Sequence, residues 1–191
     1  MAEPIRSRRL DLLPADARCL AAEMDGAAAL AAALGVRVPD DWPPELYDRD
    51  AVEFSLVVAQ YTPPEDALWL SYYFVLRDDD GRGPTVVGIG GFKGPPEAGE
   101  VEVGYSVLDA YRRRGIATEA ATALLDRAFA DPRVERVAAE TLPELVASIG
   151  VLERCGLRLL GAGIDEGALR FGITRVEWRL RLFAGTGEGR T

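Results

Sequence analysis

A short basic turn, Arg112-Arg113-Arg114-Gly115, stands between a predicted strand and a predicted helix. Polar and apolar side chains alternate over residues 100–107, which is the period of a half-buried strand. From Ile116 onward, apolar residues recur at helical spacing until Asp131-Pro132 ends the pattern. The first turn of such a helix has backbone N–H groups without partners, and a glycine lets a ligand approach them closely. Together with the positive end of the helix dipole and the arginines, these donors predict a phosphate site.

The composition excludes several kinds of chemistry. The 191-residue chain contains no histidine, which removes Ser-His-Asp and Cys-His catalysis and every metal site with histidine ligands. Cys19 and Cys155 have neither metal-ligand nor disulfide spacing, so we expect no metal and a reducing cytoplasm. The net charge of −9 argues against nucleic acid as a partner and is compatible with a cationic one. Neither a signal peptide nor a membrane span is indicated.

The rest of the chain predicts the elements that must hold the basic turn. Its length suits one domain with a single core. Strands are expected over residues 5–13, 69–76, 85–92 and 134–141, with a closing antiparallel pair over 157–162 and 175–183. Helices are expected over 15–34, with a break near Asp25-Gly26, within 45–61 and over 144–154. Three aspartates at 78–80 lack the calcium-loop pattern and are expected in a solvated hairpin loop.

The spacing Arg112-x-x-Gly115-x-Ala117 resembles the acyl-CoA signature of the GNAT superfamily of N-acetyltransferases, in which this turn cradles the pyrophosphate of CoA. Residues 89–94 and 102–105 resemble the family's third and fourth strands, and residues 147–157 resemble its Ala-Ser-x-x-x-Leu-Glu-Lys-x-Gly-Phe helix and turn. The pattern is most like that of the branch that includes ribosomal-protein N-terminal acetyltransferases. That branch also contains enzymes for small amines.

The resemblance implies an α/β fold: a central, mixed but mostly antiparallel sheet, splayed between its fourth and fifth strands and flanked by helices. Residues 1–184 would form one domain, with a helical acceptor side at 1–68 and an acyl-CoA-binding core at 69–184, and residues 185–191 are expected to be a disordered tail. Acetyl-CoA is the implied co-substrate. By position, its pantetheine arm would meet the backbone of Tyr105, Ser106 and Val107, and its pyrophosphate would meet Arg112, Arg113, Arg114, Gly115, Ile116, Ala117 and Thr118.

Glu102 is the general base that the resemblance implies, because many family members present an acid at this place on the strand. Glu140, Glu144 or a bound water are the alternatives. Ser148 matches a serine whose hydroxyl can reach the departing sulfur, and its other interpretation is a helix-start hydroxyl bonded to the backbone. Leu145 replaces the asparagine expected near the start of this helix, which removes one polar contact.

The expected function is transfer of the acetyl group of acetyl-CoA to a primary amine by direct attack in a ternary complex. The acceptor is a small molecule or a protein N-terminus, and neither its identity nor the oligomeric state follows from the sequence. The alternative, which Leu145 supports, is an inactive acyl-CoA sensor or interaction module. Four aromatic residues of the acceptor side either shape a substrate pocket or fill the core, and core is the favoured interpretation; they are Trp42, Tyr47, Tyr61 and Trp69.

Overall fold

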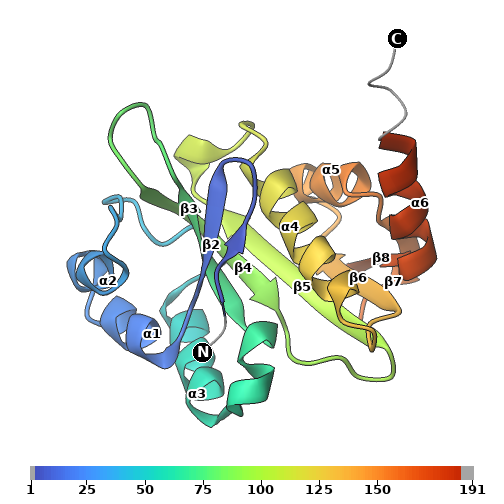
Figure 1. Cartoon of the computed structure of the whole chain (residues 1–191), viewed down its shortest axis with the longest axis horizontal. Coiled ribbons are helices and arrows are strands. Elements are labelled where there is room, and N and C mark those ends of the chain that lie inside the picture. Colours follow the sequence, from blue (N-terminus) through green and yellow to red (C-terminus); the bar gives the residue numbers. More distant parts are fainter. Residues whose placement is uncertain (1–2, 186–191) are drawn as a thin grey trace.

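One mixed sheet runs through the molecule, with helices on both of its faces (Figure 1). The computed structural model describes residues 3–185, and its eight strands lie in the order β1-β2-β3-β4-β5-β6-β8-β7. Neighbouring strands are antiparallel except β5 and β6, which are parallel. The strands are β1 (Ile5–Arg6), β2 (Leu10–Pro14), β3 (Ser71–Leu76), β4 (Thr85–Phe92), β5 (Glu100–Val107), β6 (Arg136–Thr141), β7 (Arg158–Ala162) and β8 (Leu169–Thr174).

The helices form two groups, one for each face of the sheet (Figure 1). The first group consists of α1 (Ala17–Met24), α2 (Ala27–Leu34) and α3 (Arg49–Tyr61), and it packs on side chains of β3 and β4. The second group consists of α4 (Ile116–Ala130), α5 (Val146–Arg154) and α6 (Arg175–Gly185), and it packs on the other face, mainly against β5, β6 and β8. Two short 3₁₀ helices, η1 (Pro64–Trp69) and η2 (Asp109–Tyr111), lead into β3 and follow β5.

Local sequence signals account for most helix boundaries. The side chain of Asp16 caps α1 by accepting a hydrogen bond from the Cys19 N–H at 2.8 Å, and Asp48 caps α3 in the same way. Gly26 separates α1 from α2 with a φ of 112°, and Gly35 ends α2 in the left-handed conformation. The predicted break near Asp25-Gly26 is therefore confirmed.

The central strands and the central helix follow the predicted pattern closely. β4 and β5 span residues 85–92 and 100–107, as predicted, and α4 ends at Ala130, directly before Asp131-Pro132. Gly90 allows β4 and β5 to approach, because a Cβ atom there would lie 2.5 Å from the carbonyl oxygen of Gly104. The predicted strand at 134–141 and helix at 144–154 are also present, each starting two residues later than expected.

The expected strand at 175–183 is wrong, because these residues form α6. The pair that closes the sheet is β7 with β8, whose residues Leu169–Thr174 were not predicted as a strand. A capping box starts the helix: Glu177 accepts hydrogen bonds from the N–H and hydroxyl of Thr174, and its own N–H donates to the Thr174 hydroxyl. The motif Thr174-x-x-Glu177 was visible in the sequence and indicates the helix.

The N-terminal region also differs from the prediction. Residues 5–13 form a hairpin of β1 and β2 rather than one strand, because the chain reverses at residues 7–9. The helix expected within 45–61 starts only at Arg49, and Leu46, which precedes it, is 72% exposed. Of the predicted tail, Gly185 ends α6, and residues 186–191 lie outside the described residues.

The sheet splays open between β5 and β6, as the fold class requires. These strands pair only from Glu100 to Glu102, opposite Arg136 to Ala138, whereas β5 stays paired with β4 as far as Val107. One edge of β5 therefore has no strand partner beyond Glu102. The opening between the two strands starts at that residue.

Candidate active site

The unpaired edge of β5 presents backbone groups to the opening. Along a strand, N–H and C=O groups point alternately to either side, and the Glu102 carbonyl points toward β4 because it accepts the Lys93 N–H at 2.9 Å. Tyr105 and Val107 lie three and five residues after Glu102, so their backbone N–H and C=O groups point away from β4 and into the opening. Ser106 does not, because its backbone faces β4 and its hydroxyl donates to the carbonyl of Glu45. The predicted backbone pairing of the pantetheine arm is thus geometrically open to Tyr105 and Val107 and closed to Ser106.

The basic turn after β5 has the geometry of an anion site. Gly115 precedes α4 with a φ of 74°, a conformation that L residues adopt reluctantly. Among the described residues, no side chain caps the first turn of α4. The N–H groups of Ile116, Ala117 and Thr118 consequently remain available, at the positive end of the helix dipole.

The three arginines of the turn have different surroundings. Arg112 pairs with Glu45 at 2.9 Å and with Asp109 at 3.0 Å, so part of its charge is already compensated. The guanidinium of Arg114 lies 5.2 Å from the centre of the Tyr111 ring. Arg113 is exposed and has no ion-pair partner within residues 3–185. The sequence alone does not distinguish the three arginines, whereas in the structure Arg112 and Arg114 form ion pairs and Arg113 does not among residues 3–185.

A buried carboxylate, Asp79, anchors the turn from the β3–β4 loop. It accepts hydrogen bonds from the Tyr111 hydroxyl at 2.6 Å and from Arg37 at 2.8 Å, and it lies 3.7 Å from Arg114. Burial alone would raise the pKa of Asp79, but the hydrogen bond from Tyr111 and the charges of Arg82 and Arg37 outweigh it and lower the pKa. The expectation of a solvated loop is therefore wrong for Asp79.

A charged cluster covers the face of β5 that looks away from α4. Val101 and Val103 are buried against the α4 side, so the alternating Glu100 and Glu102 face the other way. Arg170 of β8 contacts Glu100 and lies 3.5 Å from a carboxylate oxygen of Glu102. Lys93 forms a second ion pair with Glu102, whose side chain is 16% exposed. The predicted base thus lies at the start of the opening, between two cations.

The alternative bases are placed less favourably. Glu140 accepts hydrogen bonds from the Ile164 N–H at 2.9 Å and from Arg170 at 2.6 Å, so its carboxylate holds the β7–β8 loop. Burial would raise the pKa of Glu140, but these hydrogen bonds outweigh it and lower the pKa. Glu144 is exposed in the turn before α5.

Ser148 lies in the first turn of α5, across the opening from β5. Its carbonyl accepts a hydrogen bond from the Tyr105 hydroxyl at 3.3 Å, and its own hydroxyl has no partner in the described part of the chain. Leu145 occupies the N-cap of α5 and supplies no capping hydrogen bond. Cys155 ends the helix as a buried thiol whose pKa is raised by desolvation, which fits a structural role.

The acceptor-side aromatics surround an acid that the sequence did not single out. Glu23 of α1 is buried and accepts hydrogen bonds from Trp42 at 2.6 Å, Tyr73 at 2.6 Å and Tyr47 at 3.3 Å. Desolvation raises the pKa of Glu23 despite these bonds. Trp69 is fully buried and packs edge-on against Phe92, whereas Tyr61 is exposed. Core filling therefore describes Trp42, Tyr47 and Trp69.

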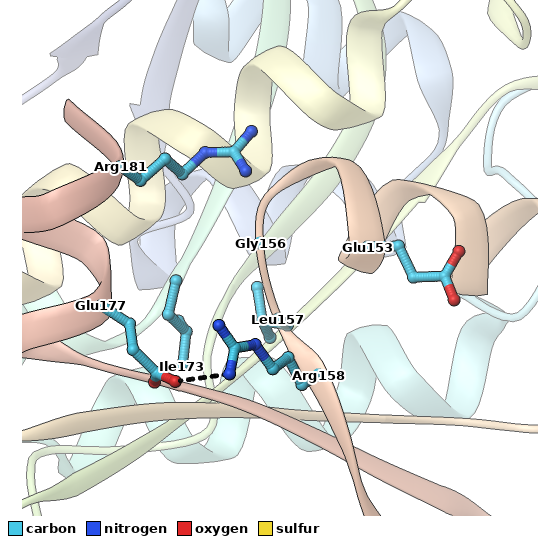
Figure 2. A pocket seen from close by; sticks show the side chains of 7 residues that line it. All are labelled: Glu153, Gly156, Leu157, Arg158, Ile173, Glu177 and Arg181. Atoms are coloured by element: carbon cyan, nitrogen blue, oxygen red, sulfur yellow. Dashed lines mark ion pairs between the residues drawn. The ribbon is translucent and has the colours of Figure 1, made fainter. Parts of the chain in front are cut away.

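A hollow of about 260 Å³, separate from the opening between β5 and β6, lies between α5, β7 and α6. Figure 2 shows its lining, in which Arg158 forms an ion pair with Glu177 at 3.3 Å. Arg181 also donates a hydrogen bond to the Arg154 carbonyl. The residues that line this hollow come from the C-terminal elements, and none belongs to β5 or to the basic turn. The hollow is therefore not the candidate active site.

Residues 3–185 contain neither a metal-binding cluster nor a membrane-spanning helix. No group of three or more histidine, cysteine, aspartate or glutamate side chains there is arranged to hold a metal ion. Within the same residues, every helix is too short or too polar to cross a membrane.

Comparisons with known proteins point to one family. The model of the acetyltransferase (GNAT) domain matches residues 14–158. A GNAT-family acetyltransferase from Bacillus anthracis is 19% identical with a TM-score of 0.60, over 91% of this chain and 99% of that one. An acetyltransferase from Agrobacterium tumefaciens is 22% identical with a TM-score of 0.60, over 91% and 95%. Mycobacterium smegmatis RimJ in complex with CoA-disulfide is 21% identical with a TM-score of 0.61, over 96% and 93%.

Proposed function

Because the chain belongs to the GNAT acetyltransferase family, we propose that it transfers the acetyl group of acetyl-CoA to a primary amine of a small molecule or a protein N-terminus. One observation carries the proposal: the opening between β5 and β6 starts at Glu102 and leads along unpaired backbone to the uncapped start of α4. A thioester with a long amide-containing arm and a pyrophosphate needs this succession of groups.

The residues present suit acetyl-CoA as a co-substrate. The N–H and C=O groups of Tyr105 and the C=O group of Val107 can pair with the amides of the pantetheine arm, as a neighbouring strand would, which leaves the Val107 N–H for the thioester. The N–H groups of Ile116, Ala117 and Thr118 can bind the pyrophosphate, and Arg113 adds a cation. Arg112 becomes available to the pyrophosphate when its contact with Glu45 opens.

The proposed reaction is a direct transfer. Glu102 removes a proton from the acceptor ammonium, and the amine nitrogen then attacks the thioester carbonyl. The N–H of Val107 stabilises the oxyanion of the tetrahedral intermediate. As the C–S bond breaks, the thiolate receives a proton from the unpartnered hydroxyl of Ser148, which is the proposed donor, and the second proton lost by the acylated nitrogen restores that hydroxyl. Lys93 and Arg170 hold the Glu102 carboxylate in position beside the opening.

The chain's charge favours a cationic acceptor, because a net charge of −9 attracts an ammonium ion more than an anion.

A second candidate function is an acyl-CoA sensor without turnover. It rests on Leu145, which places an apolar side chain at the N-cap of α5, beside the proposed thiolate site.

Release of CoA from acetyl-CoA in the presence of a panel of polyamines, aminoglycosides and N-terminal peptides tests the proposal. An enzyme releases CoA with at least one amine, whereas a sensor binds acetyl-CoA and releases none. Glu102→Gln should lower kcat by about 100-fold at neutral pH, and the loss should shrink as pH approaches the pKa of the amine. Glu100→Gln is the matched control, because it removes a carboxylate from the same Arg170 cluster without touching the start of the opening. Equal losses in both variants would assign Glu102 to the ion-pair cluster instead of proton transfer.

A further inference from the structure

The face of β5 that carries Glu102 continues as an open surface toward the end of the strand. Glu102, Gly104 and Ser106 alternate onto this face, because Val101 and Val103 are buried on the opposite one. Gly104 has no side chain, and a Cβ atom built on it would meet no atom of residues 3–185 within 4 Å. The surface over Gly104, between Glu102 and Ser106, is therefore unobstructed.

A second carboxylate, that of Glu45, lies at the far end of this surface. The Glu45 carbonyl accepts a hydrogen bond from the Ser106 hydroxyl, and the Glu45 carboxylate lies 2.9 Å from Arg112 of the basic turn. Glu102 and Ser106 are four residues apart on an extended strand, which separates the two ends of the surface by about 13 Å. The open surface thus has an acid at each end.

The loop between α2 and α3 holds Glu45 in this place. Trp42 and Tyr47, on either side of Glu45 in the sequence, donate hydrogen bonds to the buried Glu23 at 2.6 Å and 3.3 Å. Leu46 has a φ of 66°, in the left-handed region that bulky residues rarely adopt. Strained backbone of this kind clusters at functional sites, which supports a role for Glu45 beyond packing.

Arg112 links Glu45 to the proposed cofactor site. The side chains of Arg112 and Glu45 are 42% and 63% exposed, so their ion pair is weak and easily exchanged. Arg112 also belongs to the basic turn proposed to bind the pyrophosphate, a partner with more charge than one carboxylate. We therefore expect Arg112 to leave Glu45 when the cofactor is bound, which frees the Glu45 carboxylate for another cation.

We propose that Glu45 binds a second cationic group of the acceptor, so that the substrates are long diamines or polyamines. The reacting amine lies at Glu102, and the chain of methylene groups crosses Gly104. The net charge of −9 attracts such polycations, and the open surface over Gly104 leaves room for their chain. The inference rests on the proposed function and deepens it, because it names the class of acceptor and the residue that selects it.

The test measures amine binding by isothermal titration calorimetry on the full chain saturated with CoA, with ligands that differ only in the second ammonium group. Diaminooctane should bind about fivefold more tightly than octylamine, the upper end for an exposed ion pair. Glu45→Gln should remove this preference. Glu53→Gln, which makes the same change of charge at an exposed acid of α3, is the matched control and should keep it.

Two further comparisons test the span of the surface and the part played by Arg112. Diaminobutane is too short to reach from Glu102 to Glu45, so it should bind no more tightly than butylamine. Without CoA, the preference for diaminooctane should fall, because Arg112 then pairs with Glu45. Glu45→Gln should bind CoA at least as tightly as the wild type, because the variant lacks the acid that competes for Arg112.

Three results would overturn the inference and leave the proposed function intact. The first is equal affinity of the CoA-loaded wild-type protein for diaminooctane and octylamine, or binding of neither. The second is a preference that survives in Glu45→Gln or is lost equally in Glu53→Gln, which would assign it to the net charge. The third is a preference of the same size without CoA. A wild-type protein that does not bind CoA would instead contradict the proposed function itself.

Discussion

Asp79 is expected to control both the stability of the protein and the shape of the basic turn. Asp79→Asn keeps the size of the side chain but removes the charge that Arg37 and Arg114 share. One carboxylate oxygen of Asp79 accepts hydrogen bonds from both Tyr111 and Arg37. In the asparagine this oxygen either becomes an NH2 group, which cannot accept them, or stays as a neutral and weaker acceptor. Arg82 also lies 3.6 Å from Asp79, so the variant leaves three guanidinium groups facing a neutral amide.

The magnitude follows from the burial of the partners. Removing one member of a buried ion pair costs about 3–5 kcal/mol. The side chain of Asp79 is fully buried, but those of Arg37 and Arg114 are 37% and 38% exposed, so water can replace part of the lost interaction. We therefore expect a loss of about 2–3 kcal/mol in the free energy of unfolding. For a chain of this length, that corresponds to a fall in Tm of roughly 5–10 °C.

Thermal and urea unfolding of Asp79→Asn measure this loss, with Asp80→Asn as the matched control. Asp80 lies in the same loop, so Asp80→Asn makes the same chemical change there. The Asp80 side chain is 77% exposed, and its substitution removes only an ion pair of 4.0 Å with Arg114. Affinity for CoA should fall in Asp79→Asn, because Tyr111 and Arg114 belong to the segment that leads into the turn. Equal Tm values for the two variants would refute the view that Asp79 anchors this segment.

The pH dependence gives an independent check on Asp79. Although burial works in the opposite direction, the hydrogen bond from Tyr111 and the nearby arginines hold the pKa of Asp79 below its usual value of about 3.9. Its contribution to stability is therefore complete above that pH and disappears as the pH falls through the native-state pKa. The difference in unfolding free energy between wild type and Asp79→Asn should be constant near neutrality and shrink in acid.

Three further predictions concern the turn, the thiolate and the buried acid of α1. Gly115→Glu should abolish acetyl-CoA binding in calorimetry through bulk and like charge, while the left-handed φ of 74° adds only about 1–2 kcal/mol of destabilisation; unchanged affinity would move the cofactor elsewhere. Ser148→Ala should lower kcat more than it weakens CoA binding, and equal losses in steady-state kinetics and calorimetry would indicate ordinary binding. Burial raises the pKa of Glu23, so its favourable contribution exists below about pH 4.3 and is lost as pH rises through the native-state pKa. Glu23→Gln should therefore gain stability relative to wild type as pH rises in urea titrations, and parallel pH profiles would contradict this sign.

Local pattern was enough to predict the strand, turn and helix from Glu100 to Ala130. Side-chain alternation defines β5, helical spacing defines α4, and a glycine between them marks the left-handed residue that starts the helix. These features depend on residues within a few positions of one another, so the sequence contains them directly. The start of α6 is also indicated locally, by the capping box Thr174-x-x-Glu177, although the expectation for residues 175–183 was a strand.

The chemical surroundings of the site depended on the tertiary structure. Arg170 and Glu102 are 68 residues apart in the sequence, and Asp79 and Tyr111 are 32 residues apart. Neither contact could therefore be predicted from a local sequence pattern. The same is true of Glu23, whose three hydrogen-bond donors come from a loop and a distant strand. The sequence by itself determined which backbone would form the turn and which acid would stand at the start of the opening. Only the packing of the sheet decided which side chains neutralise that acid, because charges are compensated by spatial neighbours rather than by neighbours along the chain.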